Sequence, residues 1–186
     1  MIIHDLARAV VHLTLRTRQF NNKNIFGFAR SVRNQEILKI GSGVLVDGKD
    51  AYSARHFFDS SNEFEQTDIN PSFGHRVLDV TKMQYSDEYD VIICMSVLEH
   101  VFDYQQAIRS LHTALKPEGS LLVSLPVFYP LHDEPHDYWR FTEHAIRRIF
   151  SQFDELRLVT RGPREYPFAY FITANKLTDT AKLSSP

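Results

Sequence analysis

The sequence predicts an α/β fold in which helices cover both faces of a mostly parallel sheet. Helical and strand-like segments alternate along its 186 residues, as in folds built from βαβ units. Residues 89–96 form the most continuous apolar run, which is what a central parallel strand covered on both faces needs. A helical segment and a second apolar run follow, so residues 89–126 predict one complete βαβ unit.

The elements before this unit are predicted from periodicity and turn residues. A first helix is expected over residues 3–18, where Leu6, Val10 and Leu13 recur at helical spacing. A strand at residues 36–40 ends at two closely spaced glycines, and a second at 64–69 is stopped by Asn70-Pro71. We also expect a helix at about 51–59 and a strand at 75–80.

The elements after the central strand carry clear end signals. Asp103 suits the N-cap of a helix over residues 103–115, and Thr142 suits that of a helix ending near Phe153. A short link joins the last two strands, which predicts an antiparallel hairpin. The three strands expected here span residues 120–127, 156–160 and 168–174. We expect one domain over residues 1–186, divided into an N-terminal helix (1–20), a core (36–177) and a polar tail (178–186).

Composition narrows the class of protein. A net charge of −2 argues against a nucleic-acid or anionic-membrane surface, which would need clustered basic side chains. No apolar run approaches the roughly 20 residues of a membrane span, and the N-terminus lacks the features of a secretory signal, so we expect a cytoplasmic protein. The single cysteine, Cys94, excludes an internal disulfide and is expected to be a buried, inert thiol. The oligomeric state stays open.

The ordered set of motifs resembles the class I S-adenosylmethionine-dependent methyltransferases. The motifs are ILKIGSG, a strand ending in Asp68, LDV, YDVIICMSVLEHV and LKPEGSLLVSLP, and the closing hairpin resembles that family's antiparallel seventh strand. The later PLHDEPHDYWRFT resembles a sub-family of small bacterial methyltransferases. The resemblance covers residues 36–175. It implies a Rossmann-like seven-stranded sheet, S-adenosyl-L-methionine as cofactor, and O- or N-methylation of a small polar acceptor of glycan or metabolite type.

The cofactor-binding residues are expected at the carboxyl ends of the strands. The turn Gly41-Ser42-Gly43 lets a ligand approach the backbone, and the Asp68 carboxylate is placed to accept both ribose hydroxyls. The resemblance adds a set of contacts to the adenine, adenosine and methionine parts: Ile69, Asp79, Val80, Ser96 and Val97.

Two positions depart from the family pattern. Lys39 stands where the family carries an acid that helps to hold the cofactor's ammonium group, and Leu45 replaces the third glycine of the loop. A lysine pointing into the pocket would repel the ammonium group. Strand side chains alternate, so Lys39 could instead point away.

A polar cluster at residues 132–140 is the expected acceptor side, and three interpretations compete. In the first it is a lid: His132 or His136 acts as general base, while Tyr138, Trp139 and Arg140 shape the pocket. In the second it is a structural cap. In the third it binds a metal, which we do not expect, because Pro135 interrupts the helix that would align the two histidines.

Glu99 and His100 follow the central strand. His100 is a third candidate base, and Glu99 is expected mainly to orient the start of the next helix. Besides a methyltransferase, three functions remain open: a degenerate methyltransferase fold that only binds a partner, a nicotinamide-dependent dehydrogenase, and a metal hydrolase.

Overall fold

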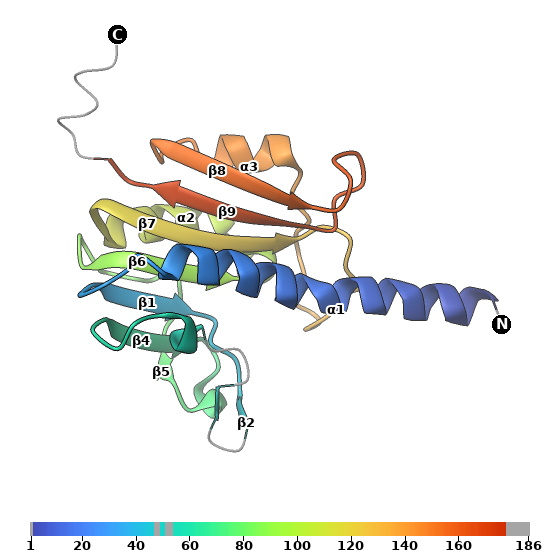
Figure 1. The fold of residues 1–186 in the computed structure, drawn as a ribbon, viewed down its shortest axis with the longest axis horizontal. Coiled ribbons are helices and arrows are strands. Elements are labelled where there is room, and N and C mark those ends of the chain that lie inside the picture. Colours follow the sequence, from blue (N-terminus) through green and yellow to red (C-terminus); the bar gives the residue numbers. More distant parts are fainter. Residues whose placement is uncertain (1, 47–48, 51–53, 178–186) are drawn as a thin grey trace, which may run out of the picture.

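A computed structural model describes residues 2–46, 49–50 and 54–177 and places a seven-stranded sheet at the centre of the chain (Figure 1). The strands of this sheet are β1 (Glu36–Ile40), β4 (Glu63–Asp68), β5 (Arg76–Val77), β6 (Tyr89–Met95), β7 (Leu115–Pro126), β8 (Glu155–Arg161) and β9 (Ala169–Asn175). Their order is β5-β4-β1-β6-β7-β9-β8. β2 (Leu45–Val46) and β3 (Lys49–Asp50) form a separate small hairpin.

The sheet is mostly parallel, as predicted. β5, β4, β1, β6 and β7 pair in parallel, while β9 is inserted antiparallel between β7 and β8. From β1 the chain first moves outward to β4 and β5, and then returns to the other side of β1 as β6. The neighbouring carboxyl ends of β1 and β6 therefore form a topological switch point, where open α/β sheets bind their ligands.

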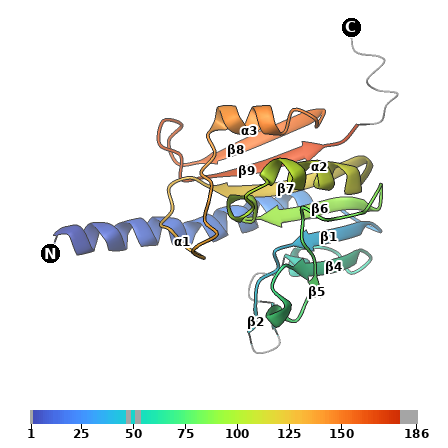
Figure 2. The same cartoon turned by 180° about the vertical axis from the view of Figure 1, so that it is seen from behind.

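Helices cover both faces of the sheet. α1 (Ile2–Ala29) lies along one face, and its N-terminal part runs out past the carboxyl ends of the strands (Figure 1). α2 (Tyr104–Ala114) and α3 (Glu143–Ile149) cover the other face (Figure 2). Both caps are as predicted: Asp103 accepts a hydrogen bond from the Gln106 amide, and Thr142 accepts one from the Ala145 amide.

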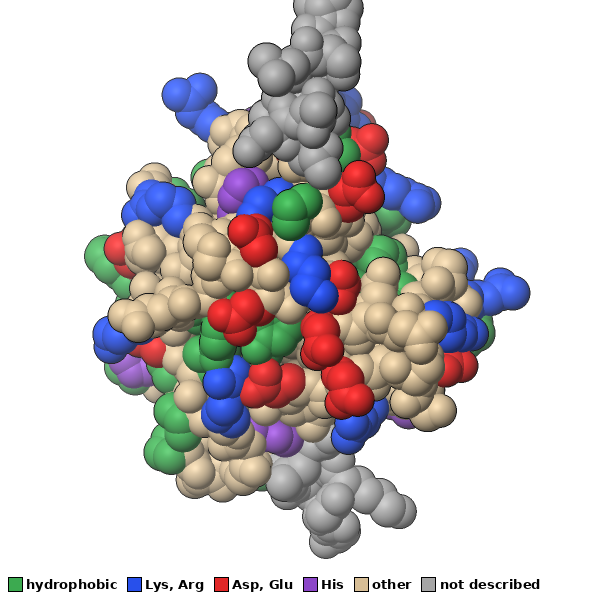
Figure 3. All heavy atoms as spheres, turned by 90° about the vertical axis from the view of Figure 1, so that its left-hand side faces the viewer, with side chains coloured by type: hydrophobic (Ala, Val, Ile, Leu, Met, Phe, Trp, Pro, Cys, Tyr) green, Lys and Arg blue, Asp and Glu red, His purple; other side chains and the backbone are tan. Residues whose placement is uncertain are grey.

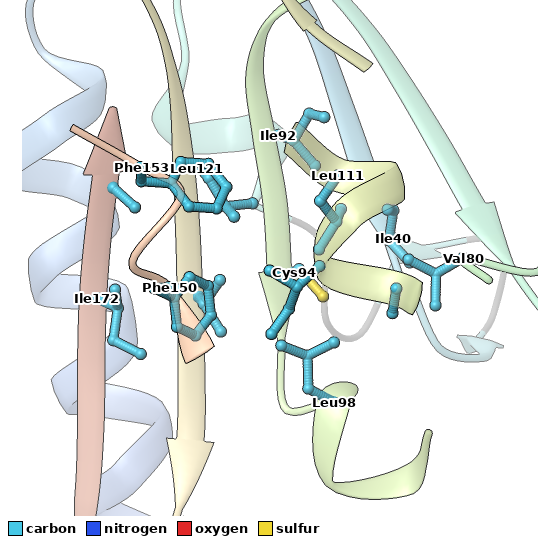
Figure 4. Packing of buried hydrophobic residues seen from close by; sticks show 14 of the residues in the cluster. Ile40, Val80, Ile92, Cys94, Leu98, Leu111, Leu121, Phe150, Phe153 and Ile172 are labelled. Atoms are coloured by element: carbon cyan, nitrogen blue, oxygen red, sulfur yellow. The ribbon is translucent and has the colours of Figure 1, made fainter. Parts of the chain in front are cut away.

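Two hydrophobic layers hold the sandwich together. Under α2 and α3 the layer includes Ile92, Cys94, Leu111 and Phe150 (Figure 4). Under α1 it includes Ile25, Ile37 and Phe171. Successive residues of β1 and β6 alternate between the two layers, which is why both strands read as continuous apolar runs.

Three predicted elements need correction. α1 continues eleven residues beyond residue 18, to Ala29, because Phe20, Ile25 and Phe28 bring a second apolar stripe onto the sheet. The helix expected at 51–59 is wrong in its described part, which contains only the 3₁₀ turn η1 (Arg55–Phe57); residues 51–53 lie outside the described residues. The strand expected at 75–80 is reduced to two residues, because the Asp79 side chain accepts hydrogen bonds from Thr81 and turns the chain.

At the end of the sheet where the parallel strands begin, acidic and basic side chains lie side by side (Figure 3). Lys116 Nζ lies 2.7 Å from Asp90 Oδ2, and Lys176 Nζ lies 2.7 Å from Asp87 Oδ1. These pairs join the ends of neighbouring elements far from the switch point. Among the described residues, no helix combines the length and the apolar character that a membrane crossing requires.

Candidate active site

The glycine turn after β1 has the shape expected of a cradle for a ligand. Gly41 and Gly43 have φ of +66° and +72°, a region that favours glycine. A Cβ on Gly41 would lie 2.4 Å from Cγ2 of Val97, so the segment that follows β6 approaches the turn more closely than any residue other than glycine would allow. The fully buried Ser42 donates its amide to the Thr67 carbonyl, and its hydroxyl has no partner within the described part of the chain.

Asp68 ends β4 beside this turn. Its side chain is buried, and its two carboxylate oxygens accept the amides of Gly43 and Asn70, each at 2.9 Å. A carboxylate has about four acceptor sites, so it keeps capacity for two further donors such as the ribose hydroxyls. Ile69 follows with 66% of its surface exposed, which leaves an apolar face open to a flat ring.

Two further side chains lie at the turn: His75, which the sequence did not single out, and Lys39. His75 Nε2 lies 3.0 Å from the Gly43 carbonyl oxygen, so an imidazole closes the outer side of the turn. Lys39 is 2% exposed, and its Nζ donates to the Gly41 carbonyl at 2.9 Å. The sequence left two orientations open for Lys39, into the cofactor pocket or away from it. The structure shows a third, in which the buried amine is hydrogen-bonded to the backbone of the turn.

Three of the predicted cofactor residues have other contacts. Asp79 accepts hydrogen bonds from Thr81 and pairs with Lys82 at 3.0 Å, and Val80 is buried in the core below Ile40. Ser96, with φ of +51°, directly follows β6, and its Oγ lies 3.3 Å from Ser124 Oγ. Their contacts to a cofactor stay predictions.

The polar cluster meets the end of β6. The backbone carbonyl of Glu99 accepts the amides of both Tyr138 and Trp139, so the segment after β7 is bound to the short helix η3 (Leu98–His100). Trp139 is anchored further: its Nε1 donates to the Val101 carbonyl, and its ring packs against Phe102 and Tyr104. Trp139, which was expected to shape the acceptor pocket, therefore fastens the segment to the domain and does not line the pocket described below.

Three histidines come together here. His100 and His132 have ring centroids 4.7 Å apart. His100 Nδ1 lies 3.0 Å from the backbone oxygen of His136, and His136 Nδ1 lies 2.8 Å from the Tyr138 hydroxyl. The fold therefore brings all three candidate bases to one place, although His100 follows β6 and the other two follow β7.

Two carboxyl groups near the histidines, those of Glu99 and Asp137, differ in their hydrogen-bond partners and in their pKa. Glu99 is completely buried, and neither carboxylate oxygen has a hydrogen-bond partner within the ranges described. This burial raises the pKa of Glu99 to about 8. Arg140 instead binds Asp137 through both terminal nitrogens, at 2.6 and 2.7 Å, and these hydrogen bonds lower the pKa of Asp137. Arg140, which was expected to shape the acceptor pocket, is therefore paired with Asp137.

A pocket of about 430 Å³ opens beside the cluster. Aromatic and apolar side chains form most of its wall, with Asp137 and Arg140 at one side: the lining residues are Val127, Phe128, Tyr129, Pro130, Leu131, Asp137, Tyr138 and Arg140. Such a pocket, apolar with a few polar groups, is typical of small-molecule sites.

Comparison with known proteins agrees with this fold. A family model described as a methyltransferase domain matches residues 8–159. The ubiquinone biosynthesis O-methyltransferase of Coxiella burnetii is 26% identical over 141 residues, which are 75% of this chain and 53% of that protein. The chain thus spans about half the length of this curated relative. A second relative of the same name, from Aeromonas salmonicida, is 42% identical over 41 residues, which are 22% of this chain and 17% of that one.

Solved structures share the architecture at low identity. A 1,6-didemethyltoxoflavin-N1-methyltransferase of Burkholderia thailandensis, solved with S-adenosylhomocysteine, has a TM-score of 0.58 at 19% identity over 85% of this chain and 79% of that one. A phosphoethanolamine N-methyltransferase of Haemonchus contortus, solved with S-adenosyl-L-methionine, has a TM-score of 0.65 at 14% identity over 84% and 52%. The family model covers more than half of the chain, so the chain belongs to the S-adenosylmethionine-dependent methyltransferases of the class I fold.

Proposed function

We propose that this chain transfers the methyl group of S-adenosylmethionine to an oxygen of a small acceptor held in the pocket beside Tyr138. One observation carries the proposal: the glycine turn with Asp68 and the histidine cluster stand at the same carboxyl edge of the sheet, on either side of the β1–β6 switch point. The cofactor-side and acceptor-side groups therefore lie at the same end of the sheet.

The cofactor side fits S-adenosylmethionine in three respects. The turn has no Cβ at Gly41 or Gly43, and Asp68 ends the neighbouring strand with acceptor capacity left. The buried Ser42 hydroxyl has no hydrogen-bond partner among the residues that the structure describes. Asp68 would hold the ribose, and the exposed Ile69 would cover one face of the adenine. The Lys39 amine is already bound by the Gly41 carbonyl, which moderates the repulsion that a free lysine would exert on the ammonium group.

On the acceptor side we assign His136 as the base. Its Nδ1 lies 2.8 Å from the hydroxyl of Tyr138, which lines the pocket; in the tautomer whose Nδ1–H donates to that oxygen, Nε2 keeps the lone pair that takes a proton. In the reaction the acceptor's oxygen bonds to the methyl carbon, the carbon–sulfur bond breaks with its electron pair going to sulfur, and the acceptor's proton passes to His136. The aromatic wall would exclude water and hold the nucleophile in line.

We choose oxygen as the methylated atom of the acceptor because the curated relatives are named O-methyltransferases. Nitrogen is the alternative, since the Burkholderia and Haemonchus proteins of similar structure are N-methyltransferases. The apolar wall favours an acceptor with an apolar part beside its nucleophile, rather than a wholly polar one.

The test has two stages. Calorimetric titration with S-adenosylhomocysteine asks whether the cofactor side binds, and methyl transfer from radiolabelled S-adenosylmethionine to a panel of hydroxylated and amino acceptors asks whether the chain is catalytic. Binding with turnover on a hydroxylated acceptor is the expected result. If S-adenosylhomocysteine does not bind at millimolar concentration, the degenerate, non-catalytic domain becomes the better description, and Lys39 at the place of the usual acid is the residue that favours it.

A further inference from the structure

We propose that Glu99, His100 and His132 form a binding site for one divalent transition-metal ion, of the kind that imidazole ligands favour, such as Zn²⁺ or Co²⁺. One potential ligand atom from each of these residues lies within 4.8 Å of the other two. The sequence argued against a metal because Pro135 separates His132 from His136. The fold instead brings His132, after β7, to a glutamate and a histidine that follow β6.

The distances suit an ion after a small adjustment. Zinc binds nitrogen and carboxylate oxygen at about 2.0–2.2 Å, which places neighbouring ligand atoms about 3–3.5 Å apart. His100 Nε2 lies 4.0 Å from Glu99 Oε1. Each side chain therefore needs to move by about 1 Å or less, on the scale of a rotamer adjustment.

Both imidazoles are already oriented as metal ligands are. His100 presents its Nδ1 to the backbone oxygen of His136 at 3.0 Å, and His132 presents its Nδ1 to the Pro130 carbonyl at 3.1 Å. An Nδ1–H that donates to an oxygen fixes the tautomer in which Nε2 carries a lone pair, and metal-binding histidines are held in this way. Asp137 Oδ2, 3.2 Å from His132 Nδ1, adds a second acceptor to the same ring.

Glu99 provides a second, independent observation in favour of a bound cation. It is 0% exposed, both carboxylate oxygens lack a hydrogen-bond partner among the described residues, and the nearby Arg140 is engaged by Asp137. A buried carboxylate without a partner is costly, and a bound cation would supply one. Asp133, whose Oδ2 lies 3.9 Å from His100 Nε2, is close enough to add a fourth ligand.

The site also adjoins the acceptor pocket. His132 packs its ring on Tyr129, at 4.7 Å between centroids, and contacts Asp137, and both of these residues line the pocket. An ion with an open position would there bind the acceptor's oxygen and favour loss of its proton. This role rests on the proposed function; the binding of the ion does not.

The experiment titrates EDTA-treated protein with Zn²⁺ by calorimetry and with Co²⁺ by visible absorption, which reports the ligands directly. We expect one ion per chain. Glu99→Gln, His100→Gln and His132→Gln should each weaken binding at least tenfold, since the loss even of supporting groups commonly costs that much. His144→Gln, which removes an exposed histidine of α3, is the matched control and should bind within twofold of the original chain.

Melting temperatures in EDTA establish that each variant is folded. Zn²⁺ should raise the melting temperature of the original chain and of His144→Gln but not of the three variants. The proposal is overturned if the folded original chain takes up no ion, or if the three variants bind as well as the control. Titration with S-adenosylhomocysteine in EDTA separates the two proposals: cofactor binding without ion binding defeats only the metal site, and ion binding without cofactor binding defeats only the proposed function.

Discussion

The Asp68 carboxylate accepts the Gly43 amide at 2.9 Å, which joins the end of β4 to the glycine turn after β1. The two strands are parallel neighbours, so this hydrogen bond fixes the position of Asp68, which is predicted to bind the ribose, relative to the glycine turn. Asp68 therefore shapes the turn, and under the proposed function the same carboxylate would also bind the ribose.

Asp68→Asn should weaken S-adenosylhomocysteine binding by about 1–3 kcal/mol, the usual cost of losing a charged hydrogen-bond partner. Asparagine keeps the shape but has one acceptor oxygen in place of two. Calorimetric titration measures the loss. Asp87→Asn, at the opposite edge of the sheet, is the control and should bind as the original chain does. Equal affinities for the two variants would remove Asp68 from the cofactor site.

Gly41→Ala should destabilise the domain by more than about 1 kcal/mol, because φ is +66° and the new Cβ would lie 2.4 Å from Val97. Gly27→Ala is the matched control: this glycine lies in α1, nothing approaches its Cβ position within 4 Å, and alanine favours a helix by roughly 0.5–1 kcal/mol. Urea unfolding measures both changes. The two substitutions should shift stability in opposite directions, and a neutral Gly41→Ala would contradict the close approach of Val97.

Lys39→Glu should cost more stability than Lys39→Met. Methionine removes the donor to the Gly41 carbonyl but fills the same buried space, whereas glutamate places a second acceptor against that carbonyl at a position only 2% exposed. Urea unfolding of the ligand-free variants makes the comparison. If Lys39→Glu is as stable as the original chain and binds S-adenosylmethionine more tightly, the amine faces the ligand, and the backbone hydrogen bond is of little consequence.

Cys94 should be unreactive in the folded protein. It is completely buried in β6, and this burial raises its pKa to about 12, so that almost no thiolate forms near pH 8. Its labelling by a disulfide reagent should therefore be slow in buffer and fast in urea. Rapid labelling of the native chain would show that the core around β6 opens easily.

The sequence predicted the elements that local pattern determines. The bounds of β1 agree with the prediction, and Asp103 and Thr142 cap their helices, because apolar runs and capping side chains act over a few residues. The length of α1 was underestimated, since the polar Asn21–Asn24 stretch hides the contacts that Phe20 and Ile25 make with the sheet. The meeting of Glu99 with His132 was missed for a different reason: it depends on how the loop after β7 folds back onto η3, which no local pattern encodes.

The last prediction separates acceptor chemistry from cofactor binding. The cofactor-side residues Gly41–Gly43 and Asp68 follow β1 and β4, whereas His136 and Tyr138 follow β7. His136→Gln should therefore leave S-adenosylhomocysteine affinity within about twofold and lower kcat/KM about a hundredfold or more, since a hundredfold is the lower end of what general base catalysis contributes. Tyr138→Phe should have a smaller effect, because it removes the partner that orients the imidazole but keeps the wall of the pocket.

Tyr166→Phe, at a 78% exposed tyrosine between β8 and β9, is the control for the second substitution. Cofactor affinity, melting temperature and turnover should be measured on the same preparation of each variant, with the acceptor found in the panel. A His136→Gln protein that turns over normally but melts earlier would make this segment a structural cap. The proton would then have to pass to His100, and His100→Gln would be the variant that loses turnover.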